Sequence, residues 1–591
     1  MRRLLTPLAV FTIWLFLFRL FFPALGPDID FGALGGDLTG HLVRGALALA
    51  GAVYLRMNFK ALADARPGLL DVILFTAFWW TVVLNAPFFR EFARHGAEAG
   101  FMTAFTAGAF FAISAAFLAL LSTLPRRFFV AFAMILTFVG TAAFAAAFLY
   151  GIALSPDMAR NFIETDGREA LGYVSLRTTA LVLFAALPPV LALLMLRRDE
   201  APRRMKKLLG TALAFAGGVL MLFVNLQNFS GAMRADKTLR YRIAPFNAVY
   251  ATAKTVWADE SPSSIKVRET VDPHPVMRDE SEKPLLFVVV VGETARSANW
   301  GLAGYERQTT PELAKINGLV SWPSSLACGT STDVSLPCML SRIGRSDYDR
   351  ERILREEPLP DLLQRAGYRV EWIENQSGCK GACDRVPTSR PKPDPEFCKG
   401  DVCMDGALVK EARERLSKLR SGEKTVLFLH MMGSHGPAYA ERSPKAFKRF
   451  GAECTSSDLA SCPRETIVNA YDHSILYTDH VLASLIRELE SRADVDTALF
   501  FASDHGESLG EKGLWLHGAP WWMAPDEQKR VPMLFWMSKG FEARRGVSRK
   551  ALLAHDPDAV THESLYSSVL GLLGVETSAY RREYDLSASG R

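Results

Sequence analysis

The hydrophobic pattern divides the chain into two halves of different character. Up to about residue 229, Ala, Leu, Phe and Val form long blocks, whereas beyond about residue 283 short apolar runs alternate with polar stretches. A helix needs about 20 mostly apolar residues to cross a bilayer. Blocks near this length occur at 5–25, 41–55, 69–89, 101–124, 128–154, 176–196 and 208–229. The pattern predicts a transmembrane helical domain over residues 1–229, with about seven helices.

The charges between these blocks predict how the helices are oriented. Basic residues cluster before the first block and after the second, fourth and sixth, whereas the loop 26–40 carries three Asp and no Lys or Arg. Short cytoplasmic loops are the ones enriched in Lys and Arg, so the N-terminus is expected in the cytoplasm. Seven crossings then place everything after residue 229 outside. The alternative for block 5–25 is a signal-peptide core, but its length and Phe content favour a retained helix.

Residues 230–282 connect the two halves. Their first part mixes Tyr and Trp with Arg and Lys, which suits either a helix lying on the membrane surface or a packed bridging helix. The stretch 259–284 contains Ser-Pro, Asp-Pro-His-Pro and many acidic residues, which is typical of a linker.

The second half, 283–591, has the pattern of a soluble α/β domain. Buried strands are predicted at 285–291, 369–373, 425–430, 497–502 and 532–537, and helical stretches separate them. This alternation predicts an α/β sheet with helices on both faces.

Charge and cysteine content narrow the setting of this domain. The net charge of +5 is modest and spread along the chain, which excludes an extended nucleic-acid surface. All eight cysteines lie in this half, as the close couples Cys328–Cys338, Cys379–Cys383, Cys398–Cys403 and Cys454–Cys462. Their spacings fit a zinc cluster poorly, and nearest-neighbour disulfides are preferred over free thiols. Disulfides imply an oxidising compartment such as the bacterial periplasm, which agrees with the topology.

Polar residues follow three of the predicted strands. Glu293 follows the first, His435 lies after 425–430, and Asp504 and His505 follow 497–502, with His517 further on. Sites in such sheets form beyond the carboxyl ends of the strands. Each residue alone could be a helix cap or part of a turn, but together they are a suitable ligand set for zinc or manganese.

The segment 328–335, Cys-Gly-Thr-Ser-Thr-Asp-Val-Ser, is crowded with hydroxyl groups. A hydroxyl at a helix N-terminus is well placed to attack a phosphate, because the backbone N–H groups attract the anion. A bound metal would lower the pKa of such a hydroxyl. Spacing alone does not choose among Thr330, Ser331, Thr332 and Ser335, and an ordinary Ser/Thr helix cap is the simpler alternative.

With these residues identified, the sequence resembles the lipid A phosphoethanolamine transferases of the colistin-resistance type, in the alkaline phosphatase/sulfatase superfamily. The motifs are VVGETAR (290–296), GYERQTTP (304–311), CGTSTDVSLPCM (328–339), GCKGACDRVP (378–387), GSHGPAY (433–439), NAYDHSILYTD (469–479), SDHGESLGEKGLWLHG (503–518) and APDEQKRVPM (524–533). The resemblance implies that Thr332 is the nucleophile. It also implies that Glu293, Thr332, Asp504 and His505 hold a catalytic Zn²⁺. His435 and His517 match positions that contact the substrate phosphate or a second zinc ion, and Lys380 and Thr330 match substrate-binding positions.

The implied reaction moves phosphoethanolamine from phosphatidylethanolamine to Thr332 and then to a lipid A phosphate, giving polymyxin resistance. The protein would be a monomer in the bacterial inner membrane, in contact with membrane lipids and with its catalytic domain in the periplasm. Alternatives are a related phosphotransferase acting on another glycan and a non-enzymatic metal or phosphate sensor. A complete ligand set argues against the sensor, and the sulfatase C/S-x-P-x-R motif is missing at the nucleophile.

The sequence departs from the family pattern in three ways. The family usually has five membrane helices, and the first two blocks here are extra. Asp333 stands beside the nucleophile where a small residue is usual, and His473 replaces the common Asn of the NAYDN-like motif.

Overall fold

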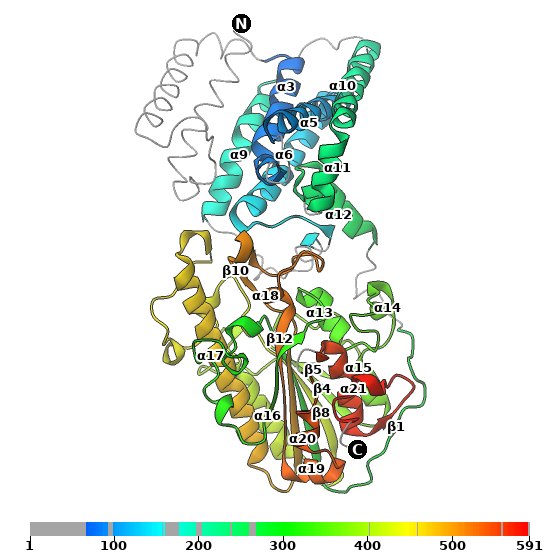
Figure 1. Ribbon diagram of the computed structural model, residues 1–591, viewed down its shortest axis with the longest axis vertical. Coiled ribbons are helices and arrows are strands. Elements are labelled where there is room, and N and C mark those ends of the chain that lie inside the picture. The colour runs from blue at the N-terminus through cyan, green and yellow to red at the C-terminus, as the bar shows by residue number, and fades with distance from the viewer. Residues whose placement is uncertain are drawn as a thin grey trace. The chain divides into compact units, whose positions relative to one another are not determined.

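The structure is a computed structural model, and it describes residues 67–92, 99–156, 158–159, 176–196, 204–236, 239–258, 268–400, 402–457, 459–556 and 559–588 (Figure 1). The predicted blocks 5–25 and 41–55 lie outside these residues. The chain forms two compact units, and the second takes up the chain from about residue 254 onward.

The described part of the first unit consists mainly of helices. Its elements are α3 (Leu69–Trp79), η2 (Trp80–Leu84), α4 (Ala86–Phe92), α5 (Ala99–Leu121), α6 (Arg126–Tyr150), α9 (Leu176–Leu194), α10 (Arg204–Val224), α11 (Leu226–Ala235), η4 (Leu239–Arg242) and α12 (Phe246–Ala258). By length and composition, Thr103–Leu121 and Arg126–Tyr150 could cross a membrane. The pair Leu69–Leu84 and Ala86–Phe92, bent by 53°, could form a third span. Helix α10 exposes Leu213 and Phe223 by more than 60% each, as expected of a surface that contacts lipid tails.

The connector contains a helix, α12, that packs against the first unit. The ring of Phe246 at the start of α12 lies 6.1 Å from that of Trp80 and 5.2 Å from that of Phe117. Ala248 and Ala251 of the same helix are buried. Val249 and Tyr250 of the same helix are exposed, so α12 packs with one face only, and both alternatives for this segment stay open.

The described part of the predicted linker 259–284, from residue 268 onward, packs in the second unit. From residue 268 the chain belongs to the second unit: Arg268 is buried, and β1 (Val276–Met277) pairs with β13 (Val575–Glu576). Asp279 forms ion pairs with Arg544 and Arg545. Pro and acidic residues suggested a solvated linker, but these ion pairs hold the segment against the domain.

A seven-stranded sheet, in the order β3-β12-β9-β2-β8-β4-β5, forms the centre of the second unit. The predicted strands are β2 (Leu285–Gly292), β4 (Arg369–Glu374), β8 (Lys424–His430), β9 (Asp496–Ser503) and β12 (Arg530–Met537). The strands that were not predicted are β3 (Val320–Leu326) and β5 (Thr388–Ser389). Strand β12 is antiparallel to β9 and β3, so the sheet is mixed.

Two helix layers enclose this sheet (Figure 1). Helices α16 (Gly406–Lys418) and α17 (Arg464–Glu490) pack on one face, where Leu286, Val288 and Val290 point. Helices α13 (Thr332–Met339), α15 (Leu359–Arg365) and α21 (His562–Leu573) pack on the other, against Phe287, Val289 and Val291. Alternate residues of β2 thus serve two cores, which is why this strand is apolar at every position.

Shorter elements complete the unit. They are α14 (Arg350–Arg355), α18 (Asp526–Lys529), α19 (Lys539–Arg545), α20 (Arg549–Leu552), β6 (Cys398–Lys399), β7 (Val402–Cys403), β10 (Ser508–Leu509) and β11 (Trp515–Leu516). Disulfides join the four nearest-neighbour pairs, Cys328–Cys338, Cys379–Cys383, Cys398–Cys403 and Cys454–Cys462.

Candidate metal and phosphoryl-transfer site

The site lies where two neighbouring parallel strands end. Gly292 of β2 pairs with Ser503 of β9, so Glu293 and Asp504 leave the sheet side by side. The side chains of Glu293, Asp504 and His505 are all buried. Three polar side chains are therefore buried together at one edge of the sheet.

These three side chains offer a compact set of ligand atoms. One carboxylate oxygen of Glu293, one of Asp504 and one ring nitrogen of His505 lie within 4.8 Å of one another. His505 Nε2 is 3.4 Å from Glu293 Oε1 and 3.4 Å from Asp504 Oδ2. Two carboxylates and an imidazole at this spacing form a common donor set for zinc.

The hydrogen bonds around the ligands leave the right atoms available for a metal. Asp504 Oδ1 accepts from the backbone N–H groups of Thr294 and His505, while Oδ2 is buried without a hydrogen-bond partner. The ring nitrogen Nδ1 of His505 lies 2.9 Å from the carbonyl oxygen of Gly506. Donation from Nδ1 leaves the lone pair of Nε2 directed at the cluster, as in most zinc-bound histidines. The residues present therefore fit a bound divalent metal.

Electrostatics also favour a cation here. Burial and the charge of Glu293 raise the pKa of Asp504 to about 6. For Glu293, burial acts upward, but the neighbouring His505, His435 and His517 outweigh it and hold the pKa well below its usual value. Two carboxylates in one buried space repel each other, and a divalent cation would relieve that repulsion.

The structure distinguishes the hydroxyl groups of the 328–335 segment. Thr330 Oγ1 donates to the carbonyl of Ala519, Ser331 Oγ donates to Asp333, and Ser335 Oγ donates to the carbonyl of Asp504. Thr332 Oγ1 alone among these four faces the ligand cluster. It lies 3.2 Å from Glu293 Oε2 and 3.3 Å from His505 Nε2.

Thr332 is the first residue of α13, and close packing fixes its position. A Cβ on Gly329 would lie 2.7 Å from the Val334 side chain and 2.8 Å from the backbone nitrogen of Ser335, so only glycine fits. The backbone N–H of Gly329 also donates to Ser335 Oγ. These contacts fix the backbone on both sides of Thr332, and so they help to position its hydroxyl in the protein without a ligand.

Asp333, the unexpected acid beside Thr332, has local partners. Its carboxylate accepts from Ser331 Oγ at 2.6 Å and lies 3.5 Å from a guanidinium nitrogen of Arg350. Arg350 also donates to the backbone carbonyl of Asp333. The added negative charge is thus partly balanced by Arg350, and the carboxylate fixes the side chain of Ser331, the residue before Thr332.

The two predicted histidines lie beside the cluster. The ring of His517 is 4.4 Å from that of His505 and 5.4 Å from that of His435, measured between centroids. Glu507, which was not predicted, is buried, and its Oε1 lies 3.5 Å from His517 Nδ1. His435, His517 and Glu507 therefore form a second polar group next to the ligand set.

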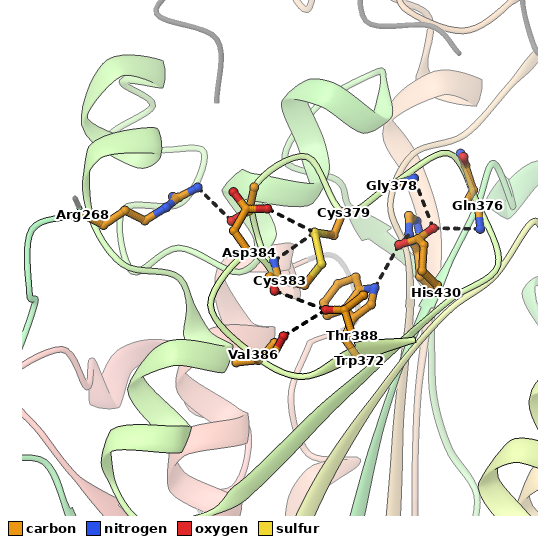
Figure 2. Close-up of a disulfide and its surroundings, with 12 residues drawn as sticks. Arg268, Trp372, Gln376, Gly378, Cys379, Cys383, Asp384, Val386, Thr388 and His430 are labelled. Atoms are coloured by element: carbon orange, nitrogen blue, oxygen red, sulfur yellow. Dashed lines mark hydrogen bonds and ion pairs between the residues drawn. A yellow bond between two sulfur atoms is a disulfide. The ribbon is translucent and has the colours of Figure 1, made fainter. Parts of the chain in front are cut away.

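Gln376 is a further site residue that was not predicted. Its Nε2 donates to Glu293 Oε2 at 2.8 Å. It follows β4 at the same sheet edge, so the rule that located the candidate ligands could also have located Gln376. Lys380 lies four residues further on, between Cys379 and Cys383, whose disulfide is drawn in Figure 2.

Backbone strain concentrates at this site. In the described part of the chain, the non-glycine residues with positive φ are Thr294 (60°), Lys380 (49°) and Leu516 (67°). Thr294 follows Glu293, and Leu516 precedes His517. Such conformations cost about 1–3 kcal/mol each and persist only where the surroundings hold them.

The other departure, His473, takes part in structural contacts. Its Nδ1 lies 3.0 Å from Glu453 Oε2, and its Nε2 accepts from the backbone N–H of Phe450. Its ring also stacks on that of Phe450. The histidine holds the segment 450–453 against α17.

His562, which was also not predicted, connects the start of the 328–335 segment to the end of β9. Its Nδ1 accepts from the backbone N–H of Cys328, and its Nε2 lies 2.9 Å from the carbonyl of Ser503. The residue is fully buried, and burial lowers its pKa to about 4. A neutral imidazole is required, because a protonated Nδ1 could not accept the bond from Cys328.

This burial predicts an acid-sensitive fold. The unfolded chain binds a proton at His562 near pH 6.5 and the folded chain only near 4. The stabilisation is complete above pH 6.5 and is lost as the pH falls to 4, by about 3 kcal/mol. Urea unfolding of the purified chain between pH 7.5 and 4.5 should show a steeper loss in the wild type than in His562→Gln. Equal slopes would contradict the assignment.

The comparisons with known proteins agree with this geometry. Residues 110–259 match the family "Phosphoethanolamine transferase EptA/EptB" and residues 286–575 match the sulfatase family. The chain is 35% identical to phosphoethanolamine transferase EptA of Escherichia coli K12, over 76% of this chain and 83% of that one. It is 31% identical to phosphatidylethanolamine transferase Mcr-1 of Escherichia coli, over 72% of this chain and 80% of that one.

A solved structure extends the similarity to both units. The integral membrane lipooligosaccharide phosphoethanolamine transferase A of Neisseria meningitidis aligns with a TM-score of 0.82 and 32% identity, over 88% of this chain and 98% of that one. Family match, sequence identity and fold all agree, and the chain belongs to the phosphoethanolamine transferase family, with a helical apolar region followed by a sulfatase-like α/β domain.

Proposed function

We propose that the protein transfers phosphoethanolamine from phosphatidylethanolamine to a lipid A phosphate through a covalent intermediate on Thr332. The observation that carries this proposal is the orientation of the Thr332 hydroxyl toward Glu293 and His505. In the first step Thr332 Oγ attacks phosphorus, and the bond from phosphorus to the diacylglycerol oxygen breaks. The proton from Thr332 ends on the diacylglycerol hydroxyl. In the second step an acceptor phosphate oxygen attacks the same phosphorus and the bond from phosphorus to Thr332 Oγ breaks. The proton of the acceptor P–OH group ends on Thr332 Oγ, which restores the hydroxyl.

Glu293, Thr332, Asp504 and His505 would hold a zinc ion. When bound, the ion would lower the pKa of the Thr332 hydroxyl and stabilise negative charge on the phosphoryl oxygens. The protein supplies the positioning: Gln376 and Thr294 donate to the carboxylate of Glu293, and backbone N–H groups fix Asp504. Pre-positioned groups of this kind reduce the reorganisation that the reaction would otherwise need.

The phosphoethanolamine group carries a negative phosphate and a positive ammonium. His435, His517 and Lys380 would bind the phosphate. The carboxylate of Glu507 is buried, and its Oε1 lies 3.5 Å from His517 Nδ1; it would form an ion pair with the ammonium. A buried carboxylate is costly without a positive partner, and a cationic headgroup would provide one.

The acceptor is proposed from the relatives. The Neisseria meningitidis relative is a lipooligosaccharide phosphoethanolamine transferase. An Escherichia coli relative, 31% identical over 56% of this chain, is a Kdo(2)-lipid A phosphoethanolamine 7''-transferase. Mass spectrometry of lipid A from cells with and without the protein tests the proposal. A phosphoethanolamine added to the lipid A disaccharide supports it, whereas one added only to the core sugars indicates the alternative glycan acceptor. An ammonium on a lipid A phosphate reduces its negative charge, so cells should also resist cationic polymyxins.

The catalytic unit is proposed to lie in the periplasm, with the N-terminus in the cytoplasm. The alternating basic loops and the four disulfides support this placement. A reporter fused after Asp259 should be active only outside the cytoplasmic membrane, and one fused after Arg203 only inside. The reverse result at either position would overturn the topology.

A further inference from the structure

A buried carboxylate behind the site connects two of its parts. Glu374 is the last residue of β4 and is 4% exposed. Its Oε1 accepts from the backbone N–H groups of Gln376, at 2.8 Å, and Gly378, at 3.3 Å. Its Oε2 accepts from Trp372 Nε1 at 2.9 Å and lies 2.9 Å from His430 Nδ1. Figure 2 labels the four partners of this carboxylate, Trp372, Gln376, Gly378 and His430. Glu374 therefore fixes the backbone of the segment that leaves β4.

One branch from Glu374 leads to the ligand set. Gln376, whose backbone Glu374 holds, donates its side-chain amide to Glu293 Oε2. The same oxygen of Glu293 lies 3.2 Å from Thr332 Oγ1. The position of Glu374 thus affects the orientation of a proposed metal ligand through a single intervening residue.

The other branch leads to the Lys380 loop. Gly378, bound to Glu374, directly precedes the Cys379–Cys383 disulfide that encloses Lys380. Arg268 donates to the carbonyl of Gly381 from the far side. Lys380 has a left-handed φ of 49°, a conformation that needs such support. Hydrogen bonds therefore fix the loop just before its first cysteine and at its centre, and the disulfide closes it.

His430 provides the positive partner of Glu374. It lies on β8 directly opposite Glu374 and is fully buried. Burial alone would raise the pKa of Glu374, but the neighbouring His430 outweighs it and lowers that pKa. The carboxylate therefore stays ionised and can accept four bonds at once, which a neutral amide could not do.

We propose that Glu374 is a positioning residue that aligns Glu293 and the Lys380 loop together, with His430 as its buried partner. The inference rests on the metal role proposed above for Glu293. The Glu374 side chain would thus couple the proposed metal ligand Glu293 to the proposed substrate-binding loop around Lys380. A change at Glu374 should disturb both sides, whereas a change further along either branch should disturb only one.

The test compares Glu374→Gln with Glu453→Gln in purified full-length protein. Glu453 forms the comparable pair with buried His473, at 3.0 Å, and it is not among the residues of the site. Glu374→Gln should bind zinc about 10–100-fold more weakly, measured by competition with a chromophoric chelator. Amide hydrogen exchange over residues 375–383 should become faster in the metal-free protein. Glu453→Gln should keep wild-type zinc affinity and wild-type exchange in that segment.

A second variant, Gln376→Met, tests the branch to Glu293 without changing the branch to the Lys380 loop. It also keeps the test possible if Glu374→Gln fails to fold. Gln376→Met removes the bond to Glu293 but keeps the backbone N–H that Glu374 holds. It should weaken zinc binding and leave exchange over residues 378–383 unchanged. Wild-type zinc affinity in both variants, or faster exchange in Glu453→Gln as well, would overturn the proposal. If the wild type bound no zinc, the proposed function would fail first, and the two failures would be distinguishable.

Discussion

A Thr332→Ala enzyme should lose phosphoethanolamine transfer by roughly 10³-fold or more, because no other atom can carry the covalent intermediate. The fold should persist, since the contacts that shape the loop belong to its neighbours. Ser335 holds Gly329 and the carbonyl of Asp504, and Thr330 holds the carbonyl of Ala519. The measurement is peptide mass spectrometry after incubation with phosphatidylethanolamine alone. A phosphoethanolamine mass should appear on the 328–338 segment of the wild type only.

Thr330→Ala is the matched control for this experiment. It removes a hydroxyl of the same type two residues away, and that hydroxyl already donates to Ala519. This variant should still form the adduct, at a reduced rate. Thr332→Ser retains an oxygen and should retain some turnover. An undiminished adduct in Thr332→Ala would move the nucleophile to a neighbouring hydroxyl.

The location of the site could be predicted because strand direction determines it. Once 285–291 and 497–502 are identified as buried parallel strands, Glu293 and Asp504 must emerge at one edge. The apolar runs required for this prediction are long and unambiguous. The same argument applied to 369–373 would have identified Gln376.

The remaining features depend on information that local pattern does not contain. Strand β3 reads Val-Ser-Trp-Pro-Ser-Ser-Leu and lies at the edge of the sheet, where a Pro is tolerated. Its antiparallel pairing with β12 is a long-range choice. Likewise, the hydroxyl groups of Thr330, Ser331 and Ser335 donate to other groups, and only these contacts indicate that the Thr332 hydroxyl is the one directed at the candidate ligands. His562 reaches the site from a helix more than 200 residues beyond Cys328, and nothing in its local sequence indicates this.

Two buried aspartates, Asp504 and Asp472, allow a test of the proposed metal site, because their hydrogen-bond partners differ. Asp504 has one oxygen on backbone N–H groups and one oxygen with no hydrogen-bond partner. Asp472 is equally buried, but its carboxylate is bound by Asn299, Tyr305 and Arg307. An Asp→Asn change is nearly isosteric at both positions. Only at Asp504 should it affect a metal.

Asp504→Asn should therefore abolish zinc binding and transfer while preserving the fold. The amide oxygen can keep the two backbone bonds, but the amide N–H₂ then occupies the place of the ligand oxygen, and a donor cannot bind a cation. Removing one of two repelling carboxylates should also leave the metal-free variant at least as heat-stable as the metal-free wild type. With zinc added the order should reverse, because ligand binding stabilises only the protein that binds. Asp472→Asn should show the opposite behaviour, with full zinc content but a lower melting temperature. Elemental analysis and melting curves with and without chelator give both readouts, and wild-type zinc content in Asp504→Asn would remove this residue from the metal site.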